Sequence, residues 1–267
     1  AVMTLPKLHP GQARVKDDLV RFNVLNCGRR WGKTTFGIDY IVDPVLRGYP
    51  VGWFSPTYKL MLEVWREARF RFQPVTRRIN TQERRIELVT EGVIEFWSID
   101  SPDVARSRKY KRAVIDEAAM IPQLEDVWEQ GIRPTLTDYQ GEALFASTPK
   151  GMNYFHKLYG RGVDPEQTDW AAWSEPTSNN PFIADTEIEA AREELPARVF
   201  AQEYLAEFLP HEGAVFRNIS EAMKAQATTP EEHKGHRIVA GVDWGKQNDF
   251  TCISVGCATC RQELARD

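Results

Sequence analysis

One segment restricts this chain to a small group of folds. A strand-like run over residues 21–26 leads into a glycine-containing loop, and a helical pattern begins at Phe36. The loop reads Cys27-Gly28-Arg29-Arg30-Trp31-Gly32-Lys33-Thr34-Thr35. A strand, such a loop and a helix in this order are typical of a phosphate-binding loop. Glycines let the backbone turn so that successive N–H groups and the helix N-terminus face phosphate oxygens.

The loop residues have distinct expected roles toward ATP and Mg²⁺. Lys33 is expected to reach the β and γ phosphates, and the Thr34 hydroxyl to bind Mg²⁺. Cys27 departs from the usual pattern, which has glycine at its position. The alternative, a chance Gly-Lys-Thr on a surface turn, is disfavoured by the strand and helix on either side. The predicted nucleotide-binding residues of the loop are Gly28, Arg29, Arg30, Trp31, Gly32, Lys33, Thr34 and Thr35.

A pair of adjacent carboxylates ends a second apolar run, Val114-Ile115-Asp116-Glu117. Ligands of open α/β sheets bind at the C-terminal ends of the strands. We expect Asp116 to belong to the Mg²⁺ shell and Glu117 to polarise the attacking water. An isolated Asp-Glu pair is usually a solvated strand end, but the phosphate-binding loop upstream favours the catalytic interpretation.

Three weaker signals accompany these motifs. The turn at residues 8–12 contains Gln12, whose amide can donate to and accept from an adenine edge. Ser147, Thr148 and Pro149 follow another apolar run and are expected to couple the γ-phosphate to DNA contacts. Arg106 precedes the Asp-Glu strand and is a candidate arginine finger, in its own subunit or a neighbouring one. The alternatives are two ordinary turns and an arginine that binds the DNA backbone or lies on the surface.

Alternating strand-like and helical patterns predict an α/β fold with a mostly parallel sheet flanked by helices. Strands are predicted at residues 21–26, 51–55, 93–97, 113–116 and 143–147. Residues 58–72 carry an apolar stripe at helical spacing, which predicts an amphipathic helix packed on the sheet. The stripe consists of Met61, Val64, Trp65, Ala68 and Phe72.

The C-terminal part has a different pattern. Thr186 is expected to cap a helix ending near Leu195, and Pro196 to begin another that runs to about Leu209. Two apolar runs at 237–244 and 250–255 predict a hairpin, which is not stable by itself and therefore indicates the start of a second domain. The predicted organisation is an ATPase core at 1–182, a helical lid at 183–210, a linker at 211–236 and an incomplete domain at 237–267.

Composition excludes several classes of protein. The net charge of −4 argues against a protein that coats nucleic acid through its overall charge. The sequence has no apolar run of the roughly 18 residues that would suggest a membrane span, and its start lacks a signal-peptide pattern. We therefore expect a cytosolic protein that is not secreted. Cys257 and Cys260 have the spacing of half a zinc site, but no Cys or His pair follows them, which favours a structural or chance pair.

Together these motifs resemble the large terminase subunit of tailed phages. Residues 28–34 resemble its arginine-containing Walker A motif, 114–117 its Walker B motif, 8–12 its adenine-recognising turn and 147–151 its coupling motif. Residues 55–58 are similar to the segment after its second strand, and 200–208 are typical of its lid. The resemblance covers nearly the whole chain, with the motifs in the family's order.

The resemblance implies an ASCE-type (RecA-like) ATPase that moves double-stranded viral DNA into a procapsid. It implies a ring, expected to be a pentamer, on the portal protein, a small terminase subunit as partner, and a site of action in the host-cell cytoplasm. The isolated chain is expected to be a monomer. Arg106 becomes the finger that acts in trans, and either Arg29 or Arg30 becomes the arginine that senses the nucleotide.

Residues 239–245 with 249–251 resemble the first hairpin of the RNase H-like terminase nuclease, with Asp243 as its first metal-binding carboxylate. The full-length protein would then also be an endonuclease that uses Mg²⁺ or Mn²⁺. Two-metal cleavage needs several carboxylates, so this chain is expected to hydrolyse ATP without cutting DNA. The competing interpretations are a helicase-like DNA translocase and a nucleotide-gated scaffold that binds ATP without turnover.

Overall fold

The chain forms two compact units, Ala1–His211 and Glu212–Asp267. The computed structural model describes residues 3–99, 104–210, 230–243, 252–260 and 262–266. Most of the predicted linker, and the loop between the two predicted hairpin strands, lie outside these residues.

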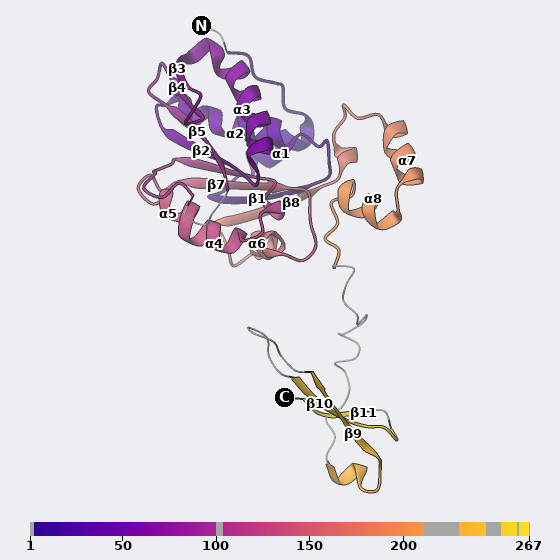
Figure 1. Ribbon diagram of the computed structural model, residues 1–267. Coiled ribbons are helices and arrows are strands. Elements are labelled where there is room, and N and C mark those ends of the chain that lie inside the picture. The colour runs from indigo at the N-terminus through magenta and orange to yellow at the C-terminus, as the bar shows by residue number, and fades with distance from the viewer. Residues whose placement is uncertain (1–2, 100–103, 211–229, 244–251, 261, 267) are drawn as a thin grey trace. The chain divides into compact units, whose positions relative to one another are not determined.

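The larger unit is built on one eight-stranded, mostly parallel sheet (Figure 1). Its strand order is β3-β4-β5-β2-β6-β7-β1-β8, and only the β3–β4 and β4–β5 pairs are antiparallel. This confirms the predicted fold class. The strands are β1 (Phe22–Cys27), β2 (Pro50–Ser55), β3 (Thr76–Asn80), β4 (Arg85–Leu88), β5 (Val93–Ser98), β6 (Arg112–Asp116), β7 (Glu142–Ser147) and β8 (Trp170–Glu175).

All five predicted strands are present, and each end lies within one residue of its predicted position. Sequence patterns missed β3, β4 and β8, which make up the two edges of the sheet. The β3 strand carries exposed arginines, and β8 is largely half-buried and contains two alanines, which have low strand propensity. Edge strands of this kind lack the apolar runs that identify the central strands.

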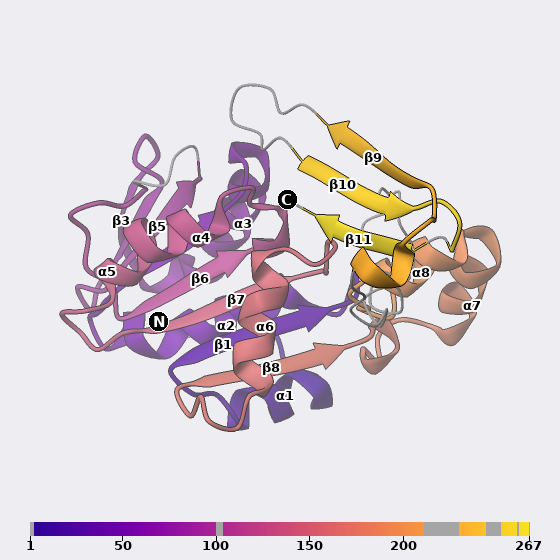
Figure 2. The same ribbon diagram turned by 90° about the horizontal axis from the view of Figure 1, so that it is seen from below.

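Helices cover both faces of the sheet (Figure 1). Helices α1 to α3 lie on one face and α4 to α6 on the other, which Figure 2 shows from below. None of the described helices is long and apolar enough to span a membrane. The helices are α1 (Pro10–Asp17), α2 (Lys33–Leu46), α3 (Tyr58–Phe72), α4 (Leu124–Asp126), α5 (Arg133–Thr135), α6 (Tyr154–Val163), α7 (Asp185–Glu194) and α8 (Ala197–Glu203), with short helical turns η1 (Gln73–Val75), η2 (Ala118–Met120), η3 (Val127–Ile132) and η4 (Thr177–Asn179).

Helix α3 follows its sequence pattern closely. The Thr57 hydroxyl accepts a hydrogen bond from the Leu60 N–H at 3.3 Å, which caps the helix N-terminus. The predicted apolar stripe is the buried face, and Trp65 packs edge-on against Phe96 of β5 with ring centroids 5.4 Å apart. Helix α3 therefore begins, ends and packs as its periodicity predicts.

Helices α7 and α8 differ in detail from prediction. Ala184 is the N-cap of α7, so the expectation that Thr186 caps this helix was wrong. The acidic Asp185 and Glu187 occupy the first turn, where the helix dipole favours negative charge. Helix α8 follows Pro196 as predicted but ends at Glu203, short of Leu209.

The early end of α8 has a local cause. The carbonyl of Glu203 accepts the Arg29 N–H, and the carbonyl of Tyr204 accepts the Thr177 N–H. Ala206 then adopts a φ of +59°, in the left-handed region that interrupts a helix. Bonds to the phosphate-binding loop and its surroundings thus replace the bonds that would continue the helix.

The smaller unit contains a three-stranded antiparallel sheet in the order β11-β10-β9. Its strands are β9 (Ile238–Asp243), β10 (Cys252–Cys257) and β11 (Gln262–Arg266), preceded by the helical turn η5 (Pro230–His233). The two predicted apolar runs pair as a hairpin, and β11 was not predicted.

Candidate functional site

Three parallel strands bring the predicted motifs together. Strand β7 lies between β1 and β6, with Ser147 opposite Asn26 and Ala146 opposite Asp116. Because parallel strands end at the same edge of the sheet, the loop after β1, the carboxylates after β6 and the residues after β7 converge.

The phosphate-binding loop has a conformation that requires glycine. Gly32 has a φ of +105° and is the N-cap of α2, which begins at Lys33. A Cβ atom on Gly28 would lie 2.4 Å from the Thr177 hydroxyl and 2.6 Å from the Tyr204 carbonyl. The first glycine is therefore required by close packing and the second by backbone geometry.

Side chains from distant segments bind four consecutive carbonyls of this loop. Thr177 donates to the Arg29 carbonyl at 2.8 Å and Asn180 to the Arg30 carbonyl at 2.6 Å. The ring of His9 contacts the Trp31 carbonyl at 2.9 Å, and the Gln12 amide donates to the Gly32 carbonyl at 3.0 Å. With its carbonyls held this way, the loop can present N–H groups to an anion. Sequence reasoning missed His9, Thr177 and Asn180, because nothing in their local patterns relates them to the loop.

Gln12 is buried beside the loop. Its Oε1 accepts the His9 N–H at 3.0 Å, while the His9 ring accepts the Gln12 N–H, forming a capping box at the start of α1. The amide thus braces Gly32 here, and its contact with adenine stays a prediction.

Lys33 connects the other two motifs. Its Nζ donates to the Thr148 hydroxyl at 2.9 Å and lies 3.6 Å from Glu117 Oε1. The Ser147 hydroxyl accepts the Ala119 N–H at 3.1 Å and lies 3.4 Å from Glu117 Oε2. The predicted catalytic lysine, catalytic glutamate and coupling residues therefore form one hydrogen-bonded group.

The two carboxylates after β6 have different surroundings. Asp116 is buried, and this burial, followed by the adjacent Glu117 charge, raises the pKa of Asp116 to about 7, while Lys33 lowers it. Glu117 is partly exposed and has a φ of +47°, an unfavourable conformation for a residue other than glycine. Strained backbone of this kind is common where a side chain must be aimed at a ligand.

A cavity of about 780 Å³ opens at this edge of the sheet. It includes most of the predicted loop residues together with Glu117, Thr148 and Pro149, while Gly28, Trp31, Asp116 and Ser147 are buried around it. Sequence reasoning had not assigned the lining residues that come from α3, α8 and the turns beside the strand ends. The cavity is lined by Arg29, Arg30, Gly32, Lys33, Thr34, Thr35, Leu60, Glu63, Glu117, Met120, Thr148, Pro149, Lys150, Gln202 and Glu203.

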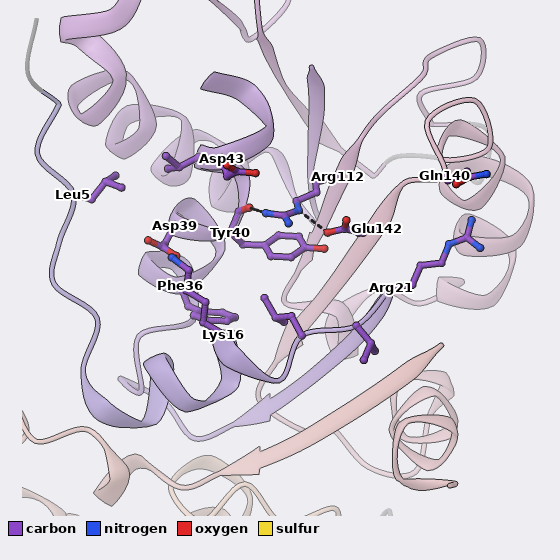
Figure 3. Close-up of a pocket in the computed structure, with 13 residues that line it drawn as sticks. Leu5, Lys16, Arg21, Phe36, Asp39, Tyr40, Asp43, Arg112, Gln140 and Glu142 are labelled. Carbon is purple, nitrogen blue, oxygen red and sulfur yellow. Dashed lines mark hydrogen bonds and ion pairs between the residues drawn. The ribbon is translucent and has the colours of Figure 1, made fainter. Parts of the chain in front are cut away.

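A larger cavity, of about 1110 Å³, lies where β6 and β7 begin (Figure 3). There Arg112 donates to Glu142 at 2.7 Å and to the Tyr40 carbonyl at 2.5 Å, with its guanidinium over the Tyr40 ring. Its volume is larger, but parallel sheets bind ligands at the opposite strand ends, and its arginine is already paired. We therefore assign the functional site to the cavity at the phosphate-binding loop.

Two predicted site residues lie away from this cavity. Arg106 is exposed, in a turn before β6, and does not line the cavity. Asp243 is the last residue of β9, and its side chain lies outside the part that the structure describes.

Comparison with known proteins follows from this geometry. The family model "Terminase large subunit, T4likevirus-type, N-terminal" matches residues 24–223 of the 267. This chain belongs to the terminase large subunit family. The terminase large subunit of Escherichia phage T5 is 27% identical over 253 residues, which cover 90% of this chain and 57% of that protein. The terminase chain thus spans well under two thirds of that relative's length.

Solved structures agree with the fold. The large terminase ATPase domain of Thermus phage P74-26 has a TM-score of 0.62 at 24% identity, covering 76% of this chain and 94% of that one. The large terminase of another thermophilic bacteriophage, solved in complex with ADP, has a TM-score of 0.62 at 16% identity, covering 90% and 60%. At these identities the likeness establishes that the terminase chain shares their α/β architecture.

Proposed function

We propose that this terminase chain is an ATP-hydrolysing motor that moves double-stranded DNA. The observation that carries the proposal is the convergence of the phosphate-binding loop, Lys33 and Glu117 on one cavity at the carboxyl edge of the sheet. One structural relative was solved with ADP, which supports a nucleotide as the ligand of the corresponding site.

The residues present fit a magnesium nucleotide. The Thr34 hydroxyl and the Asp116 carboxylate are hard oxygen ligands, which Mg²⁺ prefers, and they lie on the two motifs that converge. When bound, Mg²⁺ neutralises charge on the β and γ phosphates. Lys33 is then expected to leave Thr148 for a phosphate oxygen, and Glu117 to orient the attacking water.

The surroundings of the two loop arginines favour Arg30 as the residue that senses the nucleotide. Arg29 pairs through its side chain with Glu203, and its N–H donates to the Glu203 carbonyl at 2.7 Å. Arg30 has a φ of +64° and lines the same cavity, and among the described residues its side chain has no ion pair. Arg29 is therefore proposed to hold α8 against the loop.

The activities of the whole protein extend this proposal. We infer that the full-length terminase works in a ring on the portal of a procapsid, with a small terminase subunit, in the host-cell cytoplasm. Asp243 is proposed as a metal-binding carboxylate of an RNase H-like endonuclease that cuts concatemeric DNA. The family match favours this proposal over a helicase-like translocase.

The Glu117→Ala variant tests the motor. Removing the carboxylate that orients water is expected to reduce ATP turnover by at least about 100-fold, while ATP binding is retained. Turnover is measured by phosphate release and binding by titration with a fluorescent ATP analogue. The matched control is Glu125→Gln, an exposed glutamate of α4, which is expected to turn over ATP like the unchanged chain.

The same variant separates the motor from a scaffold that only holds ATP. A scaffold would show no turnover in the unchanged chain, and Glu117→Ala would then alter nothing. Unchanged turnover in Glu117→Ala would remove Glu117 from its proposed role.

A further inference from the structure

Four possible metal ligands meet in the smaller unit. His233 ends the η5 turn, His236 follows it, Cys257 ends β10, and Cys260 lies in the turn toward β11. One ligand atom from each residue lies within 4.8 Å of the other three. The closest pairs are Cys260 Sγ to His233 Nδ1 at 3.2 Å, Cys257 Sγ to His236 Nδ1 at 3.5 Å, and Cys260 Sγ to His236 Nδ1 at 3.8 Å.

These separations match the edges of a tetrahedral zinc site. With Zn–S near 2.3 Å and Zn–N near 2.0 Å, tetrahedral geometry places sulfur and nitrogen ligands about 3.5 Å apart. The three sulfur–nitrogen distances lie on both sides of this value. Four ligand atoms at this spacing surround a space of the size that one ion needs.

Backbone pairing creates the cluster. In the β9–β10 ladder, Ile238 lies opposite Cys257, so the residues just before β9 lie beside the turn after β10. The Ala258 N–H donates to the Arg237 carbonyl at 2.8 Å, and the Arg237 N–H donates to the Thr259 hydroxyl at 3.1 Å. These bonds hold the His-x-x-His segment against the Cys-x-x-Cys turn.

Sequence analysis recognised only half of this set, because it searched for a second ligand pair after Cys260. The pair lies before β9, and antiparallel pairing brings it back to the cysteines.

Burial in this unit supports a metal rather than an apolar core. Where burial is described there, His233 and Cys257 are the buried side chains, at 5% and 2% exposure. The apolar Ile238, Val239 and Val242 are 44–45% exposed. Small domains that bury little apolar surface commonly depend on a structural metal. The described interior of this unit therefore consists of ligand groups.

We propose that His233, His236, Cys257 and Cys260 bind one Zn²⁺ in a closed structural site. Two thiolates and two imidazoles in tetrahedral arrangement suit Zn²⁺, whereas Mg²⁺ and Mn²⁺ prefer carboxylate oxygens such as that of Asp243. Four protein ligands leave no position for a reacting water, so the ion stabilises the fold and takes no part in catalysis. The site joins the segment before β9 to the β10–β11 turn, and it is independent of the proposed ATPase activity.

Metal analysis of the purified chain tests the proposal. The chain, expressed in zinc-containing medium and passed into metal-free reducing buffer, is expected to retain about one zinc ion per molecule, measured by plasma mass spectrometry. The Cys257→Ser, Cys260→Ser double variant is expected to lose it. Cys252→Ser removes a thiol from the same strand and is the matched control, expected to retain the zinc.

A second measurement does not depend on how the variants fold. Replacing zinc by Co²⁺ in the unchanged chain is expected to give the intense visible bands of tetrahedral cobalt with thiolate charge-transfer absorption, and added Zn²⁺ should abolish both. The proposal is overturned if the unchanged chain holds no zinc and gives only the weak spectrum of octahedral cobalt. Equal zinc in the double variant and the control would also overturn it.

Discussion

Asp116 is the residue at which stability and function conflict most directly. It is a buried carboxylate beside a second carboxylate, and its nearest positive charge, Lys33, is shared with Glu117 and Thr148. Burying an ionised carboxylate is costly, which is why the pKa of Asp116 rises to about 7. A neutral residue of the same shape would relieve this cost and would lose a metal ligand.

The Asp116→Asn variant is therefore expected to be more stable without nucleotide and inactive with it. The folded-state pKa lies above the unfolded value near 3.9, so the stabilisation that protonated Asp116 provides is complete below about pH 4. It is lost as the pH rises to about 7. At pH 8 the variant should gain about 2–4 kcal/mol in free energy of unfolding, and at pH 4 almost nothing.

Urea denaturation at several pH values measures this difference. Asp126→Asn, at an exposed position of α4, is the control and should show no such pH dependence. A gain for Asp116→Asn that is the same at pH 4 and pH 8 would contradict the electrostatic explanation.

At the scale of elements, the loop after β1 and the end of α8 are packed as one piece. The space beside Gly28 is filled by the Thr177 hydroxyl and the Tyr204 carbonyl, so it cannot take a methyl group without movement. Gly28→Ala is expected to reduce the free energy of unfolding by about 1–3 kcal/mol and to weaken nucleotide binding. The measurements are thermal denaturation and titration with an ATP analogue.

Gly160 offers a matched control for this substitution. It is exposed within α6, and no atom lies within 4 Å of the position that a Cβ would take. Gly160→Ala is expected to stabilise the chain by roughly 0.5–1 kcal/mol, because alanine is the better helix former. If both variants lost the same stability, crowding at Gly28 would not be the cause.

Elements with strong periodicity were predictable from sequence. The stripe of α3 and the apolar runs of the five central strands depend on local patterns, and the motifs at the strand ends converge because parallel strands share an edge. The end of α8 and the donors to the loop carbonyls were not predictable, because they depend on contacts between residues as distant as Arg29 and Thr177. The same reason concealed His233 and His236, which only the strand register brings to the cysteines.

At the scale of the whole molecule, the position of Arg106 bears on assembly. An arginine finger must touch the phosphates of the nucleotide that it activates. Arg106 is exposed and does not line the cavity of its own chain, whereas Lys33 and Glu117 do. This arrangement favours a finger that acts on a neighbouring subunit, as a ring-shaped motor requires.

Mixing two inactive variants tests action in trans. Arg106→Ala retains a complete cavity but supplies no finger, and Glu117→Ala supplies a finger but cannot orient water. If Arg106 acts in trans, an equal mixture should recover part of the turnover that each variant lacks, because Glu117→Ala subunits supply the finger to Arg106→Ala cavities. Turnover per subunit of the unchanged chain should also rise with protein concentration. A finger acting within its own chain predicts that the mixture stays inactive at every concentration, and phosphate release distinguishes the two outcomes.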